Sequence, residues 1–180
     1  MNCKILCVLL IFSAFSISPT ARYSKETIIY IVRHAEKHIS DESNTNPGLN
    51  AEGKIRAKDL AQTLKNEKFA AVFSTPYKRT METAAPVAQR SGLPVLNYSD
   101  LAELVHTIKT TYPNKKTLIV GHSNTIMEIV KALGARPPAE KLLDDDYDFL
   151  LKVIIDKKGQ SHLKIYRFGK EHHSTKISID

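Results

Sequence analysis

Two arginines and two histidines follow apolar runs of the chain, and side chains of these types could transfer a phosphoryl group. Arg33 and His34 come directly after the first run, Arg79 comes shortly after the second, and His122 follows a later one. An imidazole is a competent nucleophile near neutral pH, and a guanidinium group matches phosphoryl oxygens in geometry and charge. Such a cluster stabilises a transferring phosphoryl group without a metal ion. These residue types therefore predict phosphoryl transfer through a phosphohistidine.

The apolar runs before these residues have the character of buried strands. Thr27–Val32, Ala70–Phe73 and Thr117–Val120 are rich in β-branched and other apolar residues, and Val95–Tyr98 is a weaker run of the same kind. In open α/β sheets, ligands bind beyond the carboxyl ends of the strands. We therefore expect the two histidines and the two arginines to converge at one edge of a sheet.

Helical patterns alternate with these strands. Apolar residues recur there at the i, i+3, i+4, i+7 spacing of one helix face. The four faces are Ala57, Leu60, Ala61 and Leu64; Met81, Ala84, Ala85 and Ala88; Leu101, Leu104, Val105 and Ile108; and Ile126, Ile129, Val130 and Leu133. Asn50 and Asp100 are placed to cap two of the helices, and Gly92 and Gly134 to end the other two. This alternation predicts an α/β fold: a three-layer sandwich with a mostly parallel central sheet flanked by helices.

The C-terminal part has a different pattern. Phe149–Asp156 and His162–Phe168 are two strand-like runs joined by a short polar segment, which predicts a hairpin at the sheet edge. The acidic run Asp144–Asp148 lacks the Gly and the closing Glu of an EF-hand, so we interpret it as a solvated loop rather than a calcium site. His172 and His173 are interpreted as polar surface.

The first 21 residues have the layout of a secretory signal peptide, which predicts a periplasmic or secreted protein. A short positive start is followed by the apolar run Ile5–Ile17 and by small residues before Arg22. The run is shorter than the ~20 apolar residues that span a bilayer, although a retained anchor remains the alternative. We therefore expect a signal peptide over 1–21, a single domain over 22–180, and no stable membrane insertion after cleavage. Both cysteines, Cys3 and Cys7, lie in the predicted signal peptide.

The chain of 180 residues is basic, with 26 Lys and Arg against 19 Asp and Glu and a net charge of +7. The basic residues are spread along the chain, and no helix-turn-helix or RNA-recognition signature accompanies them. We therefore expect no nucleic-acid partner. The excess charge serves either solubility or attraction for an anionic substrate.

Four ordered motifs resemble those of the histidine phosphatase superfamily, also called phosphoglycerate-mutase-like. They are Val32–Glu36 (VRHAE), Leu49–Gly53 (LNAEG), Phe73–Ala84 (FSTPYKRTMETA) and Val120–Thr125 (VGHSNT). The resemblance runs from about residue 28 to residue 134. It implies that His34 is the nucleophile, that Arg33 and Arg79 clamp the phosphate, and that His122 contacts the phosphoryl oxygens.

Four further residues are candidates for substrate binding. Glu36 and Lys37 stand where mutase-like members place polar substrate contacts, and the Ser and Asn usual there are missing, which counts against mutase activity. Ser123 and Asn124 follow His122 at the expected start of a helix. Their backbone N–H groups could bind an anion or simply belong to a helix cap.

The residue that protonates the leaving oxygen is not identified by the motifs. Larger family members carry this carboxylate on an insertion after the second helix, and the corresponding stretch here is short. Asp100, Glu103 and Glu36 remain as candidates, although the first two could be a helix cap and solvated surface. No metal or other cofactor is expected, because the strand ends offer mainly Arg and His rather than the carboxylates that hold hard divalent ions.

The compact length resembles the short, phosphohistidine-phosphatase-like branch of the family. The resemblance and the signal peptide together imply an exported, metal-independent phosphatase that acts on a small phosphorylated substrate, such as a phosphosugar or an envelope glycolipid. Two alternatives remain open. One is a non-catalytic phosphate- or polyanion-binding module of the same fold, and the other is a phosphoglycerate-mutase-like phosphoryl transferase.

Overall fold

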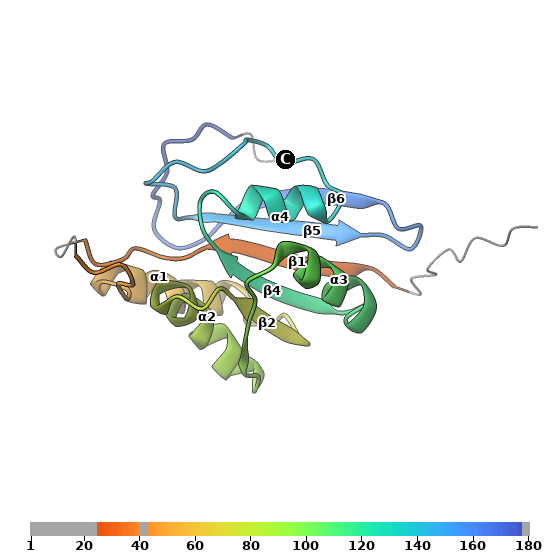
Figure 1. Cartoon of the computed structure of the whole chain (residues 1–180), viewed down its shortest axis with the longest axis horizontal. Coiled ribbons are helices and arrows are strands. Elements are labelled where there is room, and N and C mark those ends of the chain that lie inside the picture. Colours follow the sequence, from red (N-terminus) through yellow and green to blue (C-terminus); the bar gives the residue numbers. More distant parts are fainter. Residues whose placement is uncertain (1–24, 40–42, 178–180) are drawn as a thin grey trace, which may run out of the picture.

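A computed structural model describes residues 25–39 and 43–177, and the predicted signal peptide lies outside these residues. Strands and helices alternate along most of the chain (Figure 1). In chain order the elements are β1 (Thr27–Arg33), α1 (Ala51–Thr63), β2 (Ala71–Ser74), α2 (Lys78–Ser91), β3 (Val95–Asn97), α3 (Leu101–Thr111), β4 (Lys116–Gly121), α4 (Ile126–Ala132), β5 (Phe149–Ile155) and β6 (Ser161–Arg167).

One six-stranded sheet contains all of these strands, in the order β3-β2-β4-β1-β5-β6. Strands β3, β2, β4 and β1 are parallel, whereas β5 pairs antiparallel with β1 and β6 pairs antiparallel with β5. The predicted α/β class, the mostly parallel sheet and the C-terminal edge hairpin are therefore confirmed.

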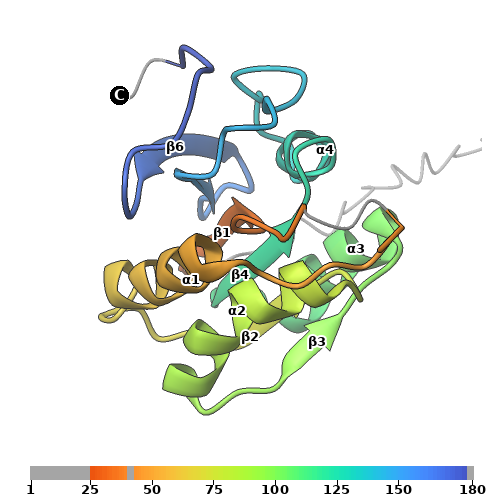
Figure 2. The same ribbon diagram turned by 90° about the vertical axis from the view of Figure 1, so that its left-hand side faces the viewer.

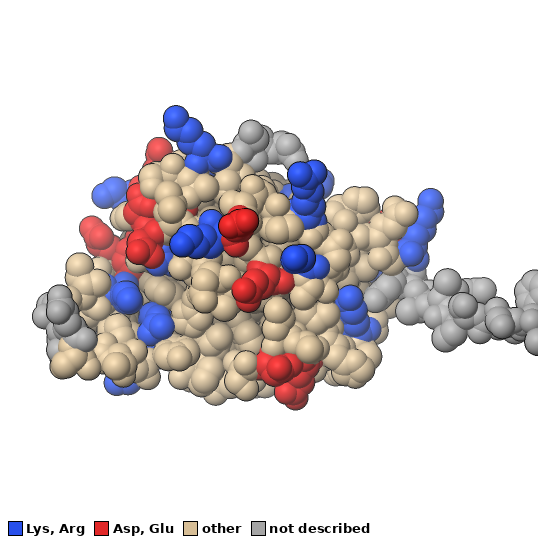
Figure 3. Space-filling view, turned by 45° about the horizontal axis from the view of Figure 1, so that its top comes forward, with Lys and Arg blue, Asp and Glu red and all other residues tan. Residues whose placement is uncertain are grey.

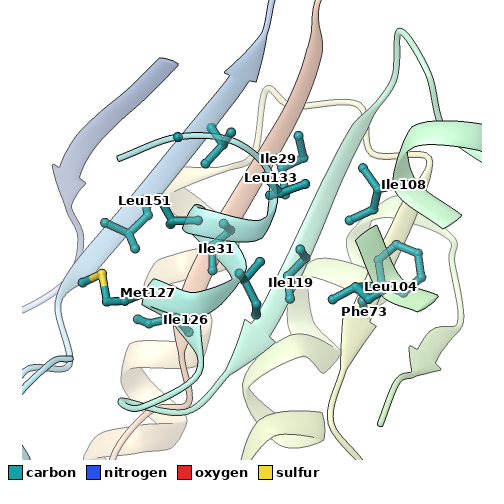
Figure 4. Close-up of a cluster of buried hydrophobic side chains, with 14 of the residues drawn as sticks. Ile29, Ile31, Phe73, Leu104, Ile108, Ile119, Ile126, Met127, Leu133 and Leu151 are labelled. Atoms are coloured by element: carbon teal, nitrogen blue, oxygen red, sulfur yellow. The ribbon is translucent and has the colours of Figure 1, made fainter. Parts of the chain in front are cut away.

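Helices cover both faces of the sheet: α1 and α2 lie on one face, and α3 and α4 on the other (Figure 2). Successive residues of a strand point to opposite faces, so Ile29 and Ile31 of β1 join the cluster under α3 and α4, while Tyr30 and Val32 join the one under α1 and α2. Figure 4 shows the first cluster, in which Leu133 and other side chains near α4 pack over β1, β4 and β5. The predicted three layers are thus present.

The buried face of α2 differs from the predicted one. Met81 and Ala85 are exposed, and the buried side chains include Thr80, Thr83 and Val87. The two threonines are buried without loss of hydrogen bonds, because the Thr83 hydroxyl donates to a backbone carbonyl 2.7 Å away and the Thr80 hydroxyl has carbonyls at 2.9 Å. A pattern that counts only apolar residues therefore misplaces this face.

The acidic run Asp144–Asp148 is anchored in the protein, and its interpretation as a solvated loop is wrong. Asp146 is 0% exposed. Its carboxylate accepts hydrogen bonds from the backbone N–H groups of Leu143, Ser174 and Thr175, at 2.6, 3.0 and 3.0 Å, and from the Thr175 hydroxyl. Burial of a carboxylate is tolerated where such hydrogen bonds replace water.

A second aspartate of the run holds the C-terminal tail, which is defined here as residues 170–177. Asp148, 1% exposed, accepts from Arg167 Nη1 at 2.9 Å, from the His172 backbone N–H at 3.2 Å and from His173 Nδ1 at 2.7 Å. His172 and His173 are therefore tail anchors rather than the predicted polar surface.

Charged side chains of both signs are interspersed over the face drawn in Figure 3, which agrees with the basic residues being spread along the sequence. Within the described residues, none of the helices combines the length and the hydropathy needed to cross a membrane.

Candidate active site

A cleft of about 600 Å³ opens beyond the carboxyl ends of the parallel strands. It is lined by all predicted site residues except Glu36, namely Arg33, His34, Lys37, Arg79, His122, Ser123 and Asn124. The register of β1 and β4 brings two motifs together, since Arg33 pairs with Gly121 and the His34 backbone N–H donates to the Gly121 carbonyl at 2.9 Å. The His34 and His122 rings consequently meet edge to face, with centroids 5.4 Å apart.

His34 is held with one ring nitrogen available for reaction. It is 4% exposed, and its Nδ1 lies 2.8 Å from the carbonyl oxygen of Ala35. A carbonyl oxygen only accepts hydrogen bonds, so Nδ1 carries the proton and donates it. The neutral ring therefore keeps its lone pair on Nε2, the nitrogen that can attack an electrophile.

Arg33 is held by the segment of the chain between α4 and β5. Its Nη1 donates to the backbone carbonyls of Leu143 at 2.8 Å and Asp144 at 3.0 Å, and its guanidinium lies over the Tyr147 ring, 4.2 Å from the centroid. These carbonyls belong to the segment that Asp146 anchors. The predicted clamp residue thus depends on a part of the chain far from every motif.

Arg79 lies over the Tyr77 ring at 4.5 Å, at the start of α2. The Nε atoms of Arg33 and Arg79 are buried and have no hydrogen-bond partner among the described residues. A buried donor without a partner costs about 1–3 kcal/mol. Two such donors on residues of one cleft are an arrangement that a bound oxyanion would satisfy, and we call Arg33 and Arg79 the candidate clamp.

Threonine hydroxyls orient His122. Its Nε2 lies 2.9 Å from Thr75 Oγ1, which lies 2.9 Å from Thr80 Oγ1. Two backbone carbonyls also lie 2.9 Å from Thr80 Oγ1, so the Thr80 hydroxyl donates to one of them. Thr75 must then donate to Thr80 and accept from His122, which places the proton of the neutral His122 ring on Nε2.

Burial and neighbouring cations keep both imidazoles neutral. Burial is the main reason that the pKa of His34 falls to about 3, and Arg33, His122 and Arg79 lower it further against the hydrogen bond to the neighbouring carbonyl. Burial, followed by Arg79, Arg33 and Lys37, lowers the pKa of His122 to about 4. At neutral pH the cleft therefore contains two uncharged imidazoles beside two guanidinium groups.

Comparison with known proteins agrees with this geometry. Residues 29–106 match the model of the histidine phosphatase superfamily (branch 1). Over this segment, the resemblance to the histidine phosphatase superfamily that the motifs predict is confirmed. It is 34% identical over 82 residues to phosphoserine phosphatase 1 of Hydrogenobacter thermophilus, an alignment that covers 43% of this chain and 39% of the relative. An uncharacterized protein of Mycobacterium tuberculosis is 37% identical over 83 residues, or 44% and 41% of the two chains. The chain thus spans about two fifths of the curated relatives it matches.

Solved structures share the fold over most of their length. The protein histidine phosphatase SixA, complexed with tungstate, has a TM-score of 0.63 at 18% identity, covering 78% of this chain and 96% of SixA. A mycobacterial glucosyl-3-phosphoglycerate phosphatase has a TM-score of 0.64 at 13% identity, covering 79% and 99%.

Glu36, which lies within the segment that matches the family model, is outside the cleft lining and is bound by an arginine. Arg56 Nε donates to both Glu36 carboxylate oxygens at 2.8 and 3.0 Å, and Arg56 Nη2 lies 2.8 Å from Oε1. The pair borders a separate cavity of about 180 Å³. Arg56 thus contacts both carboxylate oxygens of Glu36, and Glu36 is not among the residues that line the cleft.

The other two predicted acids are also outside the cleft lining. Asp100 caps α3 by accepting from the Glu103 backbone N–H at 2.7 Å, and Glu103 is exposed. Ser123 and Asn124 do line the cleft, but they form a turn before α4, which begins only at Ile126. The expectation that they open a helix is therefore wrong.

Thr75 and Asp144 are among the cleft residues that the sequence analysis did not select. Thr75 follows β2 directly, so its strand-end position was a usable signal for a partner of His122. Asp144 also lines the cleft, and its approach to Arg33 spans 111 residues of sequence. No local pattern signals a contact of that separation.

Among the described residues, no group of three or more His, Cys, Asp or Glu side chains is placed to hold a metal ion.

Proposed function

We propose that this chain is a metal-independent phosphatase that hydrolyses a phosphate monoester through a phosphohistidine on His34. One observation carries the proposal: a neutral, buried His34 with its Nε2 lone pair free lies in the same cleft as two buried guanidinium N–H donors without partners. A nucleophile and an oxyanion clamp are the two parts that such a reaction needs.

The cleft residues divide the first step between them. Arg33 and Arg79 bind the phosphoryl oxygens and neutralise the charge that spreads over them. His34 Nε2 attacks phosphorus as the bond from phosphorus to the ester oxygen breaks, and the Ala35 carbonyl stabilises the positive charge that develops on the ring. Water then attacks the phosphohistidine, and the electron pair of the N–P bond returns to Nε2.

We infer a small phosphorylated substrate. The cleft volume of about 600 Å³ is that of a small-molecule pocket, and the polar residues Lys37, Ser123 and Asn124 line it beside the clamp. Proteins of this fold include a glucosyl-3-phosphoglycerate phosphatase and phosphoserine phosphatases, and SixA is complexed with tungstate, a tetrahedral oxyanion like phosphate. With the signal peptide expected over residues 1–21, a phosphosugar or glycolipid of the cell envelope is the substrate class we propose.

Hydrolysis of p-nitrophenyl phosphate by the purified protein tests the activity. We expect turnover that resists EDTA, that inorganic phosphate inhibits competitively, and that His34→Ala abolishes. His106→Ala, which removes an exposed histidine of α3, is the matched control and should retain activity. Rapid quench should trap an acid-labile, base-stable phosphoenzyme. Phosphate binding without turnover would identify a binding module instead, and loss of activity with EDTA that a divalent ion restores would contradict the mechanism.

Export is tested separately. The mass of the protein recovered from its native host should correspond to a chain that lacks the expected signal peptide. An intact Met1 on protein in the cytosol would contradict export without affecting the proposed chemistry.

A further inference from the structure

Breaking a phosphate ester leaves negative charge on the departing oxygen, and an alcohol departs slowly unless an acid protonates it. The inference below rests on the proposed phosphatase activity. The acids expected from the sequence cannot supply this proton in the described structure, since Glu36 is bound by Arg56 and neither Asp100 nor Glu103 lines the cleft. The donor has to come from another part of the chain.

Asp144 is the one acidic residue among those lining the cleft in the described structure. Its Oδ1 lies 3.9 Å from Arg33 Nη2, and its side chain is fully exposed to the cleft solvent. Its backbone carbonyl accepts from Arg33 Nη1 at 3.0 Å. A phosphoryl group held by Arg33 would therefore lie within reach of the Asp144 carboxyl group.

The backbone of Asp144 is fixed, whereas its side chain is exposed. Leu143 donates its N–H to the buried Asp146 carboxylate at 2.6 Å, and Arg33 Nη1 binds the carbonyls of Leu143 and Asp144. Asp146 is in turn bound by Thr175 of the C-terminal tail. A proton donor on an anchored segment is presented to the cleft at low cost in conformational entropy.

We propose that Asp144 is the general acid of the reaction. As His34 Nε2 forms its bond to phosphorus and the P–O ester bond breaks, the proton of the Asp144 carboxyl group moves to the leaving oxygen, and an alcohol departs. The carboxylate that remains then accepts a proton from the water that attacks the phosphohistidine. The second step restores both the acid and the free imidazole.

The bound substrate itself favours the acid form. A phosphate monoester brings negative charge beside Asp144 and compensates the positive charge of Arg33. Like charge nearby disfavours an ionised carboxylate, so substrate binding promotes protonation at the point where the proton is required.

Aryl phosphates that differ in their leaving group test the assignment, with Asp144→Asn compared to Asp145→Asn. Asp145 is a suitable control because it does not line the cleft and its Oδ1 accepts from Ser174 Oγ at 2.7 Å, which an Asn oxygen can continue to do. The kcat/KM values for p-nitrophenyl phosphate and phenyl phosphate are measured for each variant, because kcat/KM reports on formation of the phosphoenzyme alone.

We expect Asp144→Asn to lower kcat/KM for phenyl phosphate by about tenfold or more, because the poorer leaving group needs the proton. Its kcat/KM for p-nitrophenyl phosphate should stay within about threefold of the wild-type value, since p-nitrophenolate departs without one. Asp145→Asn should match the wild type with both esters. An equal fall for both esters, or no fall for either, would overturn the assignment of Asp144 and leave the proposed phosphatase intact. A wild-type protein without any turnover would overturn both.

Discussion

Removing the carboxylate of Glu36 should weaken the fold without weakening the chemistry. In the structure the two oxygens of this carboxylate accept from Arg56 Nε at 2.8 and 3.0 Å, and Arg56 Nη2 lies 2.8 Å from Oε1. The Glu36 side chain is 7% exposed and the Arg56 side chain 4%. Arg56 also donates to the carbonyls of Phe168 and Lys170, so the pair joins α1 to the chain after β6. Glu36→Ala leaves a guanidinium group buried without its counter-ion.

Losing one partner of a buried ion pair costs about 3–5 kcal/mol. At about 2–4 °C of Tm for each kcal/mol in a chain of this size, Glu36→Ala should lower Tm by roughly 6–20 °C. Glu36→Leu combined with Arg56→Met removes both charges and should recover much of that loss, because no unpaired charge remains. Thermal and urea unfolding of the single and double variants measure these values.

Activity assays on the same variants complete the test. With the protein kept well below its Tm, Glu36→Ala should retain kcat/KM for aryl phosphates within about threefold, because Glu36 does not line the cleft. A variant that unfolds like the wild type but loses kcat/KM by about a hundredfold would show that Glu36 is a catalytic acid, and the reasoning from its ion pair would be refuted.

Three further predictions follow from the site and its surroundings. His34, whose pKa is lowered to about 3, should stay neutral by ¹⁵N NMR from pH 8 to about pH 5. Its contribution to the free energy of unfolding should be lost as the pH falls below 6.5, because the unfolded chain takes up a proton there that the folded chain does not. A His34 ring that titrates near 6.5 would contradict this prediction. Arg79→Lys should lower kcat/KM about thirtyfold or more (~2 kcal/mol), because the forked guanidinium group is lost. Arg90→Lys, at the exposed end of α2, should leave kcat/KM unchanged. Equal kcat/KM values for the two variants would place Arg79 outside the clamp. Gly53→Ala should destabilise the chain strongly in urea unfolding, because its Cβ would lie 2.1 Å from the Glu36 carbonyl oxygen, and an unchanged midpoint would exclude this clash.

The sheet and the core of the site could be predicted from the sequence because their signals are local. Each strand is an apolar run, each predicted site residue lies at the end of its strand or within a few positions of it, and parallel strands end at the same edge. Those three facts bring Arg33, His34 and His122 together without any knowledge of packing. They also predict that Arg79 lies at the same edge, because α2 begins just beyond β2.

The remaining features depend on contacts between distant residues. Glu36 stands two positions after His34, the proposed nucleophile, yet its role is decided by Arg56, which reaches it only when α1 packs on the sheet. The acidic run looks solvated in sequence because Thr175, which binds Asp146, is 29 residues away. Polar residues whose partners lie so far along the chain cannot be assigned to core or surface by periodicity alone.

The dependence of Arg33 on the C-terminal tail has a consequence for biosynthesis. The recognisable motifs end at Thr125, but the carbonyls that hold Arg33 belong to a segment fastened by Thr175. On the ribosome, every motif emerges well before Thr175, so the proposed clamp gains this anchor only when the C-terminal tail has been made. A transcript with a late stop codon would likewise encode the complete signature of the superfamily and a protein with a loosened clamp.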